Sequence, residues 1–256
     1  MKQQHMARFF PFVLVVAVAA LTYAQAPPRA PATLKSPKDA APFDITGYWV
    51  SIVTEDWRTR MFTPLKGDFS GIPISVEGRK VAEAWDPVRD EAEENQCKSY
   101  GAAAIMRVPG RFHIVWENEN TLKIETDSGM QTRFLHFSGT LPQRPNPQLQ
   151  GYSTAAWERQ LGSSGGDGRG PGPSGSLKVV TVNLKPGYLR KNGVPYSDKT
   201  VVTEFYDLVH EPDSEWLIVK TIVDDPVYLQ RPFITSTNLR RQIDSSGWNP
   251  TKCAAK

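Results

Sequence analysis

Three side chains in this chain have the chemistry of general acid–base catalysis: Glu204, His136 and Tyr228. In the segment 200–209, the alternation of a strand places Glu204 on a face that also carries valine, tyrosine and leucine. Burial among apolar neighbours disfavours the charged form of a carboxyl and suits it to proton transfer. Glu204 would then be the base, and His136 or Tyr228 the acid, of an isomerase, hydratase or cyclase.

A structural role competes with catalysis for Glu204. A buried glutamate is stabilised by an arginine, and Arg133 or Arg107 could pair with it and join two strands. His136 and His113 lie in alternating segments, so either could point inward as a base or metal ligand, or stay half-exposed on the sheet. The chain has no H-x-H, H-E-x-x-H or C-x-x-C motif, so the sequence predicts no metal site and no cofactor.

Aromatic side chains form the second group of candidate site residues. The chain has seven tryptophans, which would first of all fill a core, but which also fit a barrel that holds an apolar or planar ligand. The residues that would form the wall of such a site are Trp49, Trp116, Tyr206 and Tyr228, with Glu204 or Arg133 to orient the ligand. The predicted partner is a small apolar molecule.

A sheet is needed to position these residues, and most of the chain has the pattern of strands. Segments rich in β-branched and aromatic residues occur at 45–54, 111–117, 121–126, 131–137, 152–159, 177–184, 200–209, 215–223 and 233–240. Ser75 can cap a helix that runs to Trp85, and Asp86-Pro87 ends it before another turn at 88–94. Short connections predict an all-β, antiparallel up-and-down barrel with one or two short helices.

Residues 1–26 have the layout of a secretory signal peptide. Lys2 and Arg8 provide a positive start, and an apolar run from Phe9 to Leu21 is followed by small residues. The run is shorter than the ~20 residues that a membrane-spanning helix needs, so we expect cleavage rather than an uncleaved anchor. The protein is then exported, to the periplasm or the extracellular space, and no membrane span follows the signal.

Composition divides the rest of the chain. We expect a disordered linker at 27–42, a β-barrel domain at 43–243 with a flexible glycine-rich insert at 162–176, and a C-terminal tail at 244–256. The net charge is +3 and falls by two, to +1, when the two cations of the signal are removed. A near-neutral mature chain gives no electrostatic reason to bind nucleic acid or anionic lipid.

Cys97 and Cys253 are the only cysteines of the chain. An even number of cysteines in an exported protein favours a disulfide, which here would tie the C-terminal tail to the body of the domain. Two unpaired thiols are the alternative, because the sequence does not give the distance between the two side chains.

Two short motifs resemble those of the calycins, which include the lipocalins. Gly47-Tyr48-Trp49 opens the first expected strand, and Asn238-Leu239-Arg240-Arg241 ends the last. In calycins the tryptophan of G-x-W closes the base of the barrel and a late arginine packs over it, so the resemblance implies such a barrel here. The length of the chain and the helix before the central strands depart from a plain lipocalin.

A longer pattern, between residues 97 and 233, is similar to that of a group of uncharacterised exported bacterial β-proteins. Their pattern is C-x-P-x-G-x-P, then G-H-S-x-G-x-W-E-G-D-x-L-V-V, E-x-F and D-P-x-x-Y-x-x-P-W. The corresponding segments here are Cys97–Pro109, Gly151–Glu158, Glu204-Phe205 and Asp225–Phe233. Tyr152 replaces the histidine of the group and Phe233 its last tryptophan. The resemblance implies an exported β-fold and no particular reaction.

Together these features predict an exported β-barrel protein that binds a small, largely apolar ligand in its interior. The first alternative is an acid–base enzyme with a carboxylate inside the barrel. The second alternative is a structural or partner-binding protein of the cell envelope.

Overall fold

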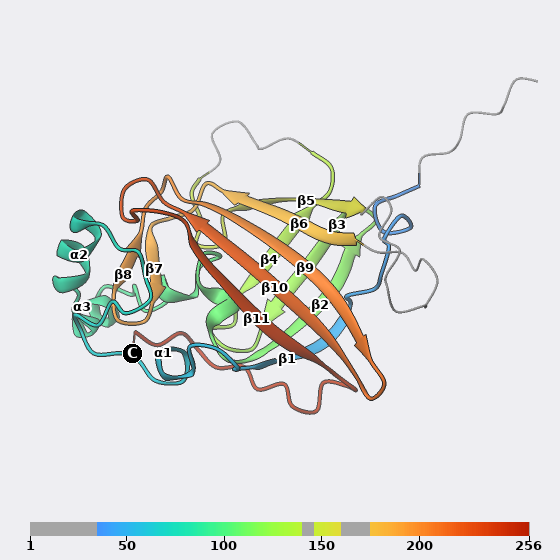
Figure 1. The fold of residues 1–256 in the computed structure, drawn as a ribbon, viewed down its shortest axis with the longest axis horizontal. Helices are drawn as coiled ribbons and strands as arrows, with labels where there is room; N and C mark the ends of the chain where they lie inside the picture. Colours follow the sequence, from blue (N-terminus) through green and yellow to red (C-terminus); the bar gives the residue numbers. More distant parts are fainter. Residues whose placement is uncertain (1–34, 140–145, 160–174, 256) are drawn as a thin grey trace, which may run out of the picture. The chain divides into compact units, whose positions relative to one another are not determined.

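The computed structural model describes residues 35–139, 146–159 and 175–255. Within these ranges, nine strands close into a barrel in the order β1-β11-β10-β9-β6-β5-β4-β3-β2 (Figure 1). The barrel strands are β1 (Gly47–Ile52), β2 (Arg111–Asn118), β3 (Thr121–Thr126), β4 (Thr132–His136), β5 (Tyr152–Arg159), β6 (Gly175–Val182), β9 (Val201–Glu211), β10 (Ser214–Asp224) and β11 (Phe233–Gln242). The predicted all-β barrel is confirmed.

One pair of neighbouring strands departs from the predicted antiparallel arrangement. β4 and β5 run parallel, with Leu135 opposite Ser153. Strand directions that alternate around a closed ring require an even number of strands, and the barrel has nine. At least one parallel pair is therefore unavoidable, and the prediction of a wholly antiparallel barrel is wrong at this point. The connection from 137 to 151 has the length that a parallel crossover needs.

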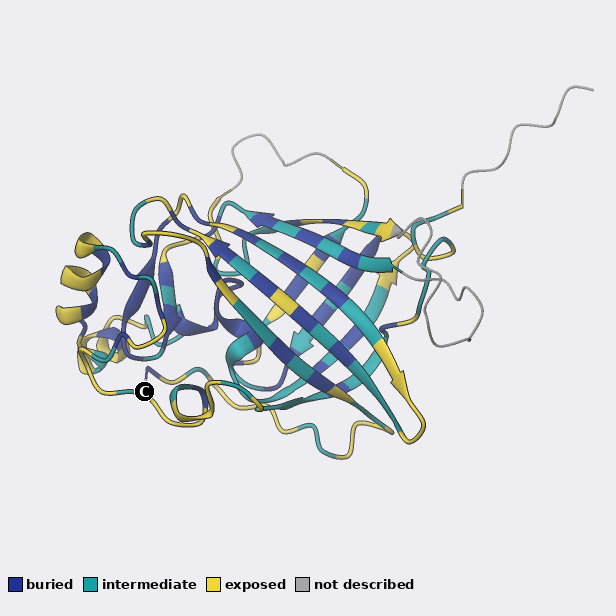
Figure 2. Cartoon of the chain, viewed as in Figure 1, coloured by how far each residue is buried: buried dark blue, intermediate teal, exposed yellow. Residues whose placement is uncertain are grey.

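The alternation of each strand sorts its side chains between the interior and the outer surface, which Figure 2 shows as alternating buried and more exposed positions along the strands. In β9 the buried positions include Val202, Glu204 and Tyr206, as the sequence pattern predicts. The apolar side chains that fill the barrel core and are at most 1% exposed include Trp49, Phe112, Ile114, Leu122, Ile124, Leu135, Leu177, Val179, Leu217, Val219 and Leu239.

Helices and a small second sheet lie at one end of the barrel, on the left in Figure 1. The helices are α1 (Trp57–Met61), α2 (Val76–Glu83), α3 (Pro87–Ala92) and the 3₁₀ turns η1 (Lys98–Tyr100) and η2 (Ile105–Arg107), and the sheet pairs β7 (Gly187–Arg190) with β8 (Val194–Tyr196). The described part thus has three α-helices where the sequence predicted one or two. A second apolar core, which includes Ile74, Leu189 and Phe233, joins this end to the barrel.

Two helix starts follow the sequence signals. The Ser75 hydroxyl accepts a hydrogen bond from the Gly78 N–H at 3.0 Å and caps α2 as predicted. The Asp86 carboxylate accepts one from the Val88 N–H at 3.0 Å and begins α3. The helix α1 and the β7–β8 hairpin were not predicted, because both are too short for their periodicity to show in the sequence.

The two ends of the described chain pack against the barrel. The predicted linker at 27–42 is described from residue 35 onward, and residues 35–42 contain a turn. Lys38 pairs with Glu119 at 3.2 Å there, and the Pro37 carbonyl accepts a hydrogen bond from Trp157. Cys97 and Cys253 form a disulfide that ties the C-terminal tail to η1. The predicted signal peptide and most of the glycine-rich insert lie outside the described residues.

Candidate functional site

The structure brings three of the predicted site residues together inside the barrel. Arg133 donates from both terminal nitrogens to the Glu204 carboxylate, at 3.1 and 2.6 Å, and the Tyr206 hydroxyl donates to the same carboxylate at 3.3 Å. Burial alone lowers the pKa of Arg133, but Glu204 and Tyr206 raise it above its ordinary value. Of the two arginines that the sequence allowed as partners, Arg133 therefore holds Glu204 as one half of a buried ion pair.

The two proposed acids lie away from this carboxylate. His136 sits on the face of β4 opposite to Arg133, half-buried and stacked on Tyr152 with ring centroids 4.9 Å apart. Tyr228 belongs to the turn after β10 and lines a cavity outside the barrel. Neither of the two predicted acids is therefore paired with Glu204, whose titratable neighbours are Arg133 and Tyr206. His113 also faces outward, beside Glu125 at 3.0 Å, and the described residues contain no cluster of metal ligands.

Two of the residues predicted to form the wall of an interior binding site are part of the barrel core. Trp49 and Tyr206, predicted as walls of a binding site, are completely buried in the barrel core. Trp116 lies in an aromatic cluster: its ring centroid is 5.3 Å from that of Phe137, and the ring centroids of Phe137 and Trp157 are also 5.3 Å apart. These aromatic side chains therefore pack in and against the barrel core.

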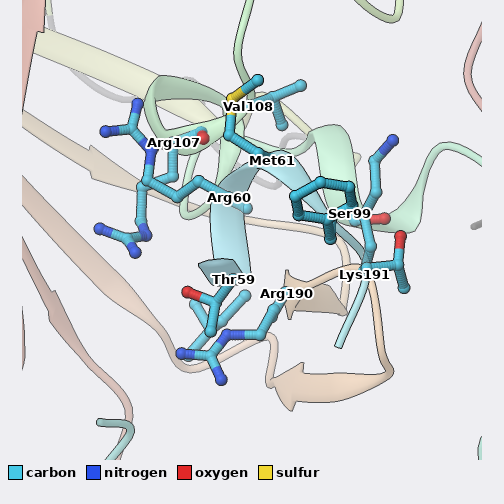
Figure 3. A pocket seen from close by; sticks show the side chains of 12 residues that line it. Thr59, Arg60, Met61, Ser99, Arg107, Val108, Arg190 and Lys191 are labelled. Carbon is cyan, nitrogen blue, oxygen red and sulfur yellow. Dashed lines mark hydrogen bonds between the residues drawn. The ribbon is translucent and has the colours of Figure 1, made fainter. Parts of the chain in front are cut away.

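Four cationic side chains instead gather around a small cavity at the helical end. Arg60 comes from α1, Arg107 from η2, Arg190 from the end of β7, and Lys191 follows it (Figure 3). In Figure 3 the three guanidinium groups lie on one side of α1. The cavity measures about 90 Å³ and is also lined by Thr59, Thr63 and Ser99. The described residues that line it include no carboxylate.

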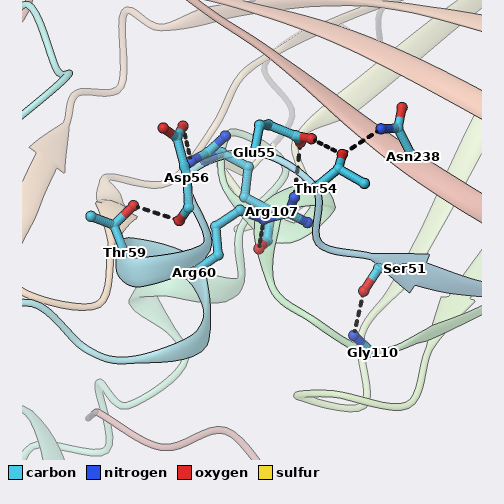
Figure 4. Close-up of polar contacts among 9 residues, drawn as sticks. All are labelled: Ser51, Thr54, Glu55, Asp56, Thr59, Arg60, Arg107, Gly110 and Asn238. Carbon is cyan, nitrogen blue, oxygen red and sulfur yellow. Dashed lines mark hydrogen bonds and ion pairs between the residues drawn. The ribbon is translucent and has the colours of Figure 1, made fainter.

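Each arginine is held in place through some of its nitrogens. Arg60 donates from Nη1 to Glu55 at 2.9 Å and from Nε to the Arg107 carbonyl at 3.0 Å (Figure 4). Arg107 donates from Nη2 to Asp56 at 2.8 Å, and Arg190 donates from Nη2 to the Ser70 carbonyl at 2.9 Å. These bonds fix the guanidinium planes before any ligand arrives, which reduces the entropic cost of binding.

The remaining terminal nitrogen of each arginine is buried and has no hydrogen-bond partner among the described residues: Arg60 Nη2, Arg107 Nη1 and Arg190 Nη1. A buried guanidinium N–H without an acceptor is costly, and three in one cavity are more so. Burial lowers the pKa of Arg60 and of Arg190, and the positive charge of Arg107 lowers both further. An anion in the cavity would supply acceptors and relieve this repulsion.

The chain was compared with models of protein families, with curated proteins and with solved structures. None of them matches. The site is therefore interpreted from its own geometry. Within the described ranges, none of the helices has the length and apolar character needed to cross a membrane.

A second, larger cavity of about 450 Å³ lies between α2, β7 and β8. Its aromatic lining is Trp85, Tyr188, Tyr196 and Tyr228. Tyr188 donates a hydrogen bond to Asp90 at 2.8 Å, and Lys98 pairs with the same carboxylate at 3.1 Å. Trp85 Nε1 and Tyr196 Oη are buried without a hydrogen-bond partner among the described residues, but both belong to neutral side chains. The arginine cavity is the better candidate site, because the buried atoms without a hydrogen-bond partner there belong to charged groups.

Sequence reasoning missed the arginine cavity because its parts are far apart in the chain. Arg60, Arg107 and Arg190 occur in segments with no common motif, and only the fold of the helical end brings them together. The one local signal is the cationic composition of α1, Trp57-Arg58-Thr59-Arg60-Met61. It is too short to be distinguished from an ordinary solvated turn.

Proposed function

We propose that this protein is an exported β-barrel that binds a small ligand carrying an anionic group, a carboxylate, phosphate or sulfate, in the arginine cavity. One observation carries the proposal: Arg60, Arg107 and Arg190 line one cavity, each has a buried nitrogen without a hydrogen-bond partner, and no described carboxylate lines that cavity. Planar guanidinium groups are the side chains best suited to such oxyanions. Export is supported by the predicted signal peptide and by the Cys97–Cys253 disulfide, since disulfides persist in oxidising compartments.

The size of the cavity limits what it holds. About 90 Å³ accommodates a single anionic group rather than a whole metabolite. Met61 and Phe62 also line the cavity, and both are largely exposed at its rim. The rest of the ligand would therefore leave the cavity along an apolar edge. The sequence predicts a largely apolar ligand. In this proposal the apolar part of the ligand lies along that edge, outside the barrel.

Thermal unfolding with added anions tests the proposal. Phosphate, sulfate and acetate are titrated at constant ionic strength against chloride. A ligand at 100 times its Kd stabilises the folded state by about 2.7 kcal/mol, so the midpoint should rise with the logarithm of the anion concentration above Kd. Arg190→Gln should remove this rise. The matched control is Arg231→Gln, which deletes the same charge at an exposed position. If no anion stabilises the protein more than chloride does, the proposal fails.

A further inference from the structure

An unusually apolar surface borders the arginine cavity. Four large apolar side chains within nine residues of sequence are exposed: Trp57 by 57%, Met61 by 55%, Phe62 by 68% and Leu65 by 83%. These four residues are called the 57–65 surface below. Single exposed apolar residues are common, but such a concentration in one short segment indicates a surface that binds something.

The local structure directs these side chains away from the protein. Trp57 and Met61 are four residues apart on α1 and share one of its faces, while Arg60 between them is buried. The helix is fixed from its inner side by the bond from Arg60 to the Arg107 carbonyl at 3.0 Å. The apolar side chains on the outer side of α1 are therefore exposed to solvent.

The charges beside this surface indicate its partner. Arg60, Arg107 and Arg190 keep unpartnered nitrogens at the cavity that Met61 and Phe62 line. An anionic group next to protruding apolar side chains is the arrangement of a lipid headgroup above its acyl chains. Tryptophan is favoured at this boundary between water and hydrocarbon, because its ring is apolar and its N–H is polar. A basic side chain near an anionic bilayer also contributes attraction.

We propose that the 57–65 surface docks on the surface of an anionic bilayer, with one headgroup phosphate in the arginine cavity and the four apolar side chains among the upper acyl chains. This inference rests on the proposed function, because it identifies the anionic ligand as a lipid. A bilayer fits better than a single dissolved amphiphile, since each of the four apolar side chains is more than half exposed and a bilayer can receive all of them.

Vesicle co-sedimentation tests the docking. The full chain is mixed with vesicles of phosphatidylcholine alone or of phosphatidylcholine and phosphatidylglycerol in equal amounts. Binding should require phosphatidylglycerol, and the double variant Trp57→Ser/Phe62→Ser should weaken it at least about tenfold. The control is Val88→Ser/Ile243→Ser, which removes two apolar side chains that are 68% and 104% exposed elsewhere. Every variant has the same N-terminus, so any binding through residues 1–26 is common to all.

Three results would overturn the docking: equal binding to both kinds of vesicle, unchanged binding of Trp57→Ser/Phe62→Ser, or a dimer in solution that this variant dissociates. The phosphate titration without vesicles separates the two proposals. Stabilisation by phosphate without binding to phosphatidylglycerol vesicles overturns the docking and leaves the anion site intact. If phosphate does not stabilise the protein either, the anion site fails as well.

Discussion

Arg133 donates hydrogen bonds from both terminal guanidinium nitrogens to the Glu204 carboxylate inside the barrel, and both residues are at most 1% exposed. The pair joins β4 to β9, strands that are not neighbours in the barrel wall. Its position across the interior explains why the carboxylate that the sequence suggested as a catalytic base is held as a structural anion.

The first prediction concerns this ion pair. Arg133→Met leaves the Glu204 carboxylate buried without its partner and should lower the free energy of unfolding by about 3–5 kcal/mol. The double variant Arg133→Met/Glu204→Leu removes both charges and should recover most of this loss. Urea denaturation of the two variants measures the difference. A double variant as unstable as the single one would show that packing, and not the unpaired charge, causes the loss.

The second prediction concerns the disulfide. Cys97 and Cys253 are 156 residues apart, so the bond closes a long loop of the unfolded chain. By the loop-entropy model its loss costs about 5 kcal/mol, at the upper end of the usual range. Reductant should therefore lower the urea midpoint of the wild-type protein. Cys97→Ser/Cys253→Ser should have the lower midpoint with or without reductant. An unchanged midpoint of the reduced wild-type protein would contradict the prediction.

The sequence predicted what depends on local pattern. The alternation in 200–209 placed Val202, Glu204 and Tyr206 correctly in the interior, because side chains of a strand alternate between its faces. The cap at Ser75 followed from side-chain chemistry in the same way. The parallel β4–β5 pair could not be predicted, since it follows from the number of strands that close the ring.

The candidate site depends on tertiary structure, and the net charge of the whole chain gave no sign of it. A net charge of +3 for 256 residues gave no reason to expect an anionic partner. The net charge does not show that four cationic residues line one small cavity at the helical end. The aromatic content was similarly ambiguous: Trp49 is completely buried in the barrel core, whereas Trp57 is 57% exposed on α1.

The third prediction concerns pH and Asp225. Burial alone raises the pKa of this carboxyl, but bonds from the Ser197 N–H, the Thr200 hydroxyl and the N–H groups of Tyr228 and Val227 lower it below its ordinary value. A carboxyl with a lowered folded-state pKa stabilises the protein above its unfolded pKa of about 3.9, and this contribution is lost as the pH falls through the folded value.

Asp225→Asn should therefore lower the free energy of unfolding at neutral pH by about 1–3 kcal/mol and flatten its decline below about pH 4. Urea titrations at several pH values measure both effects. The control is Asp224→Asn, which alters the exposed carboxylate next to it and removes none of the four bonds to Asp225. If the free energy of unfolding changed with pH in the same way for wild type and Asp225→Asn, the prediction would be contradicted.

The fourth prediction compares two glycines with positive φ. Gly67 has a φ of +89° and open space around its missing Cβ, whereas Gly129 has a φ of +79° and a Cβ there would lie 2.2 Å from the Tyr100 ring. Gly67→Ala should cost only the backbone strain, about 1–2 kcal/mol. Gly129→Ala should cost this strain and about 1–3 kcal/mol more for the displaced ring.

The clash at Gly129 has a second consequence that distinguishes it from strain. The Gly129 N–H donates to the Thr251 carbonyl at 2.9 Å, and the Tyr100 hydroxyl accepts from the Ala254 N–H at 3.3 Å. Displacing the ring would loosen the segment that carries Cys253, so Gly129→Ala should also speed reduction of the disulfide by a thiol under native conditions. Gly67→Ala should not. Equal unfolding free energies and equal reduction rates for the two variants would contradict the prediction, because the Tyr100 contact would then constrain neither the turn nor the tail.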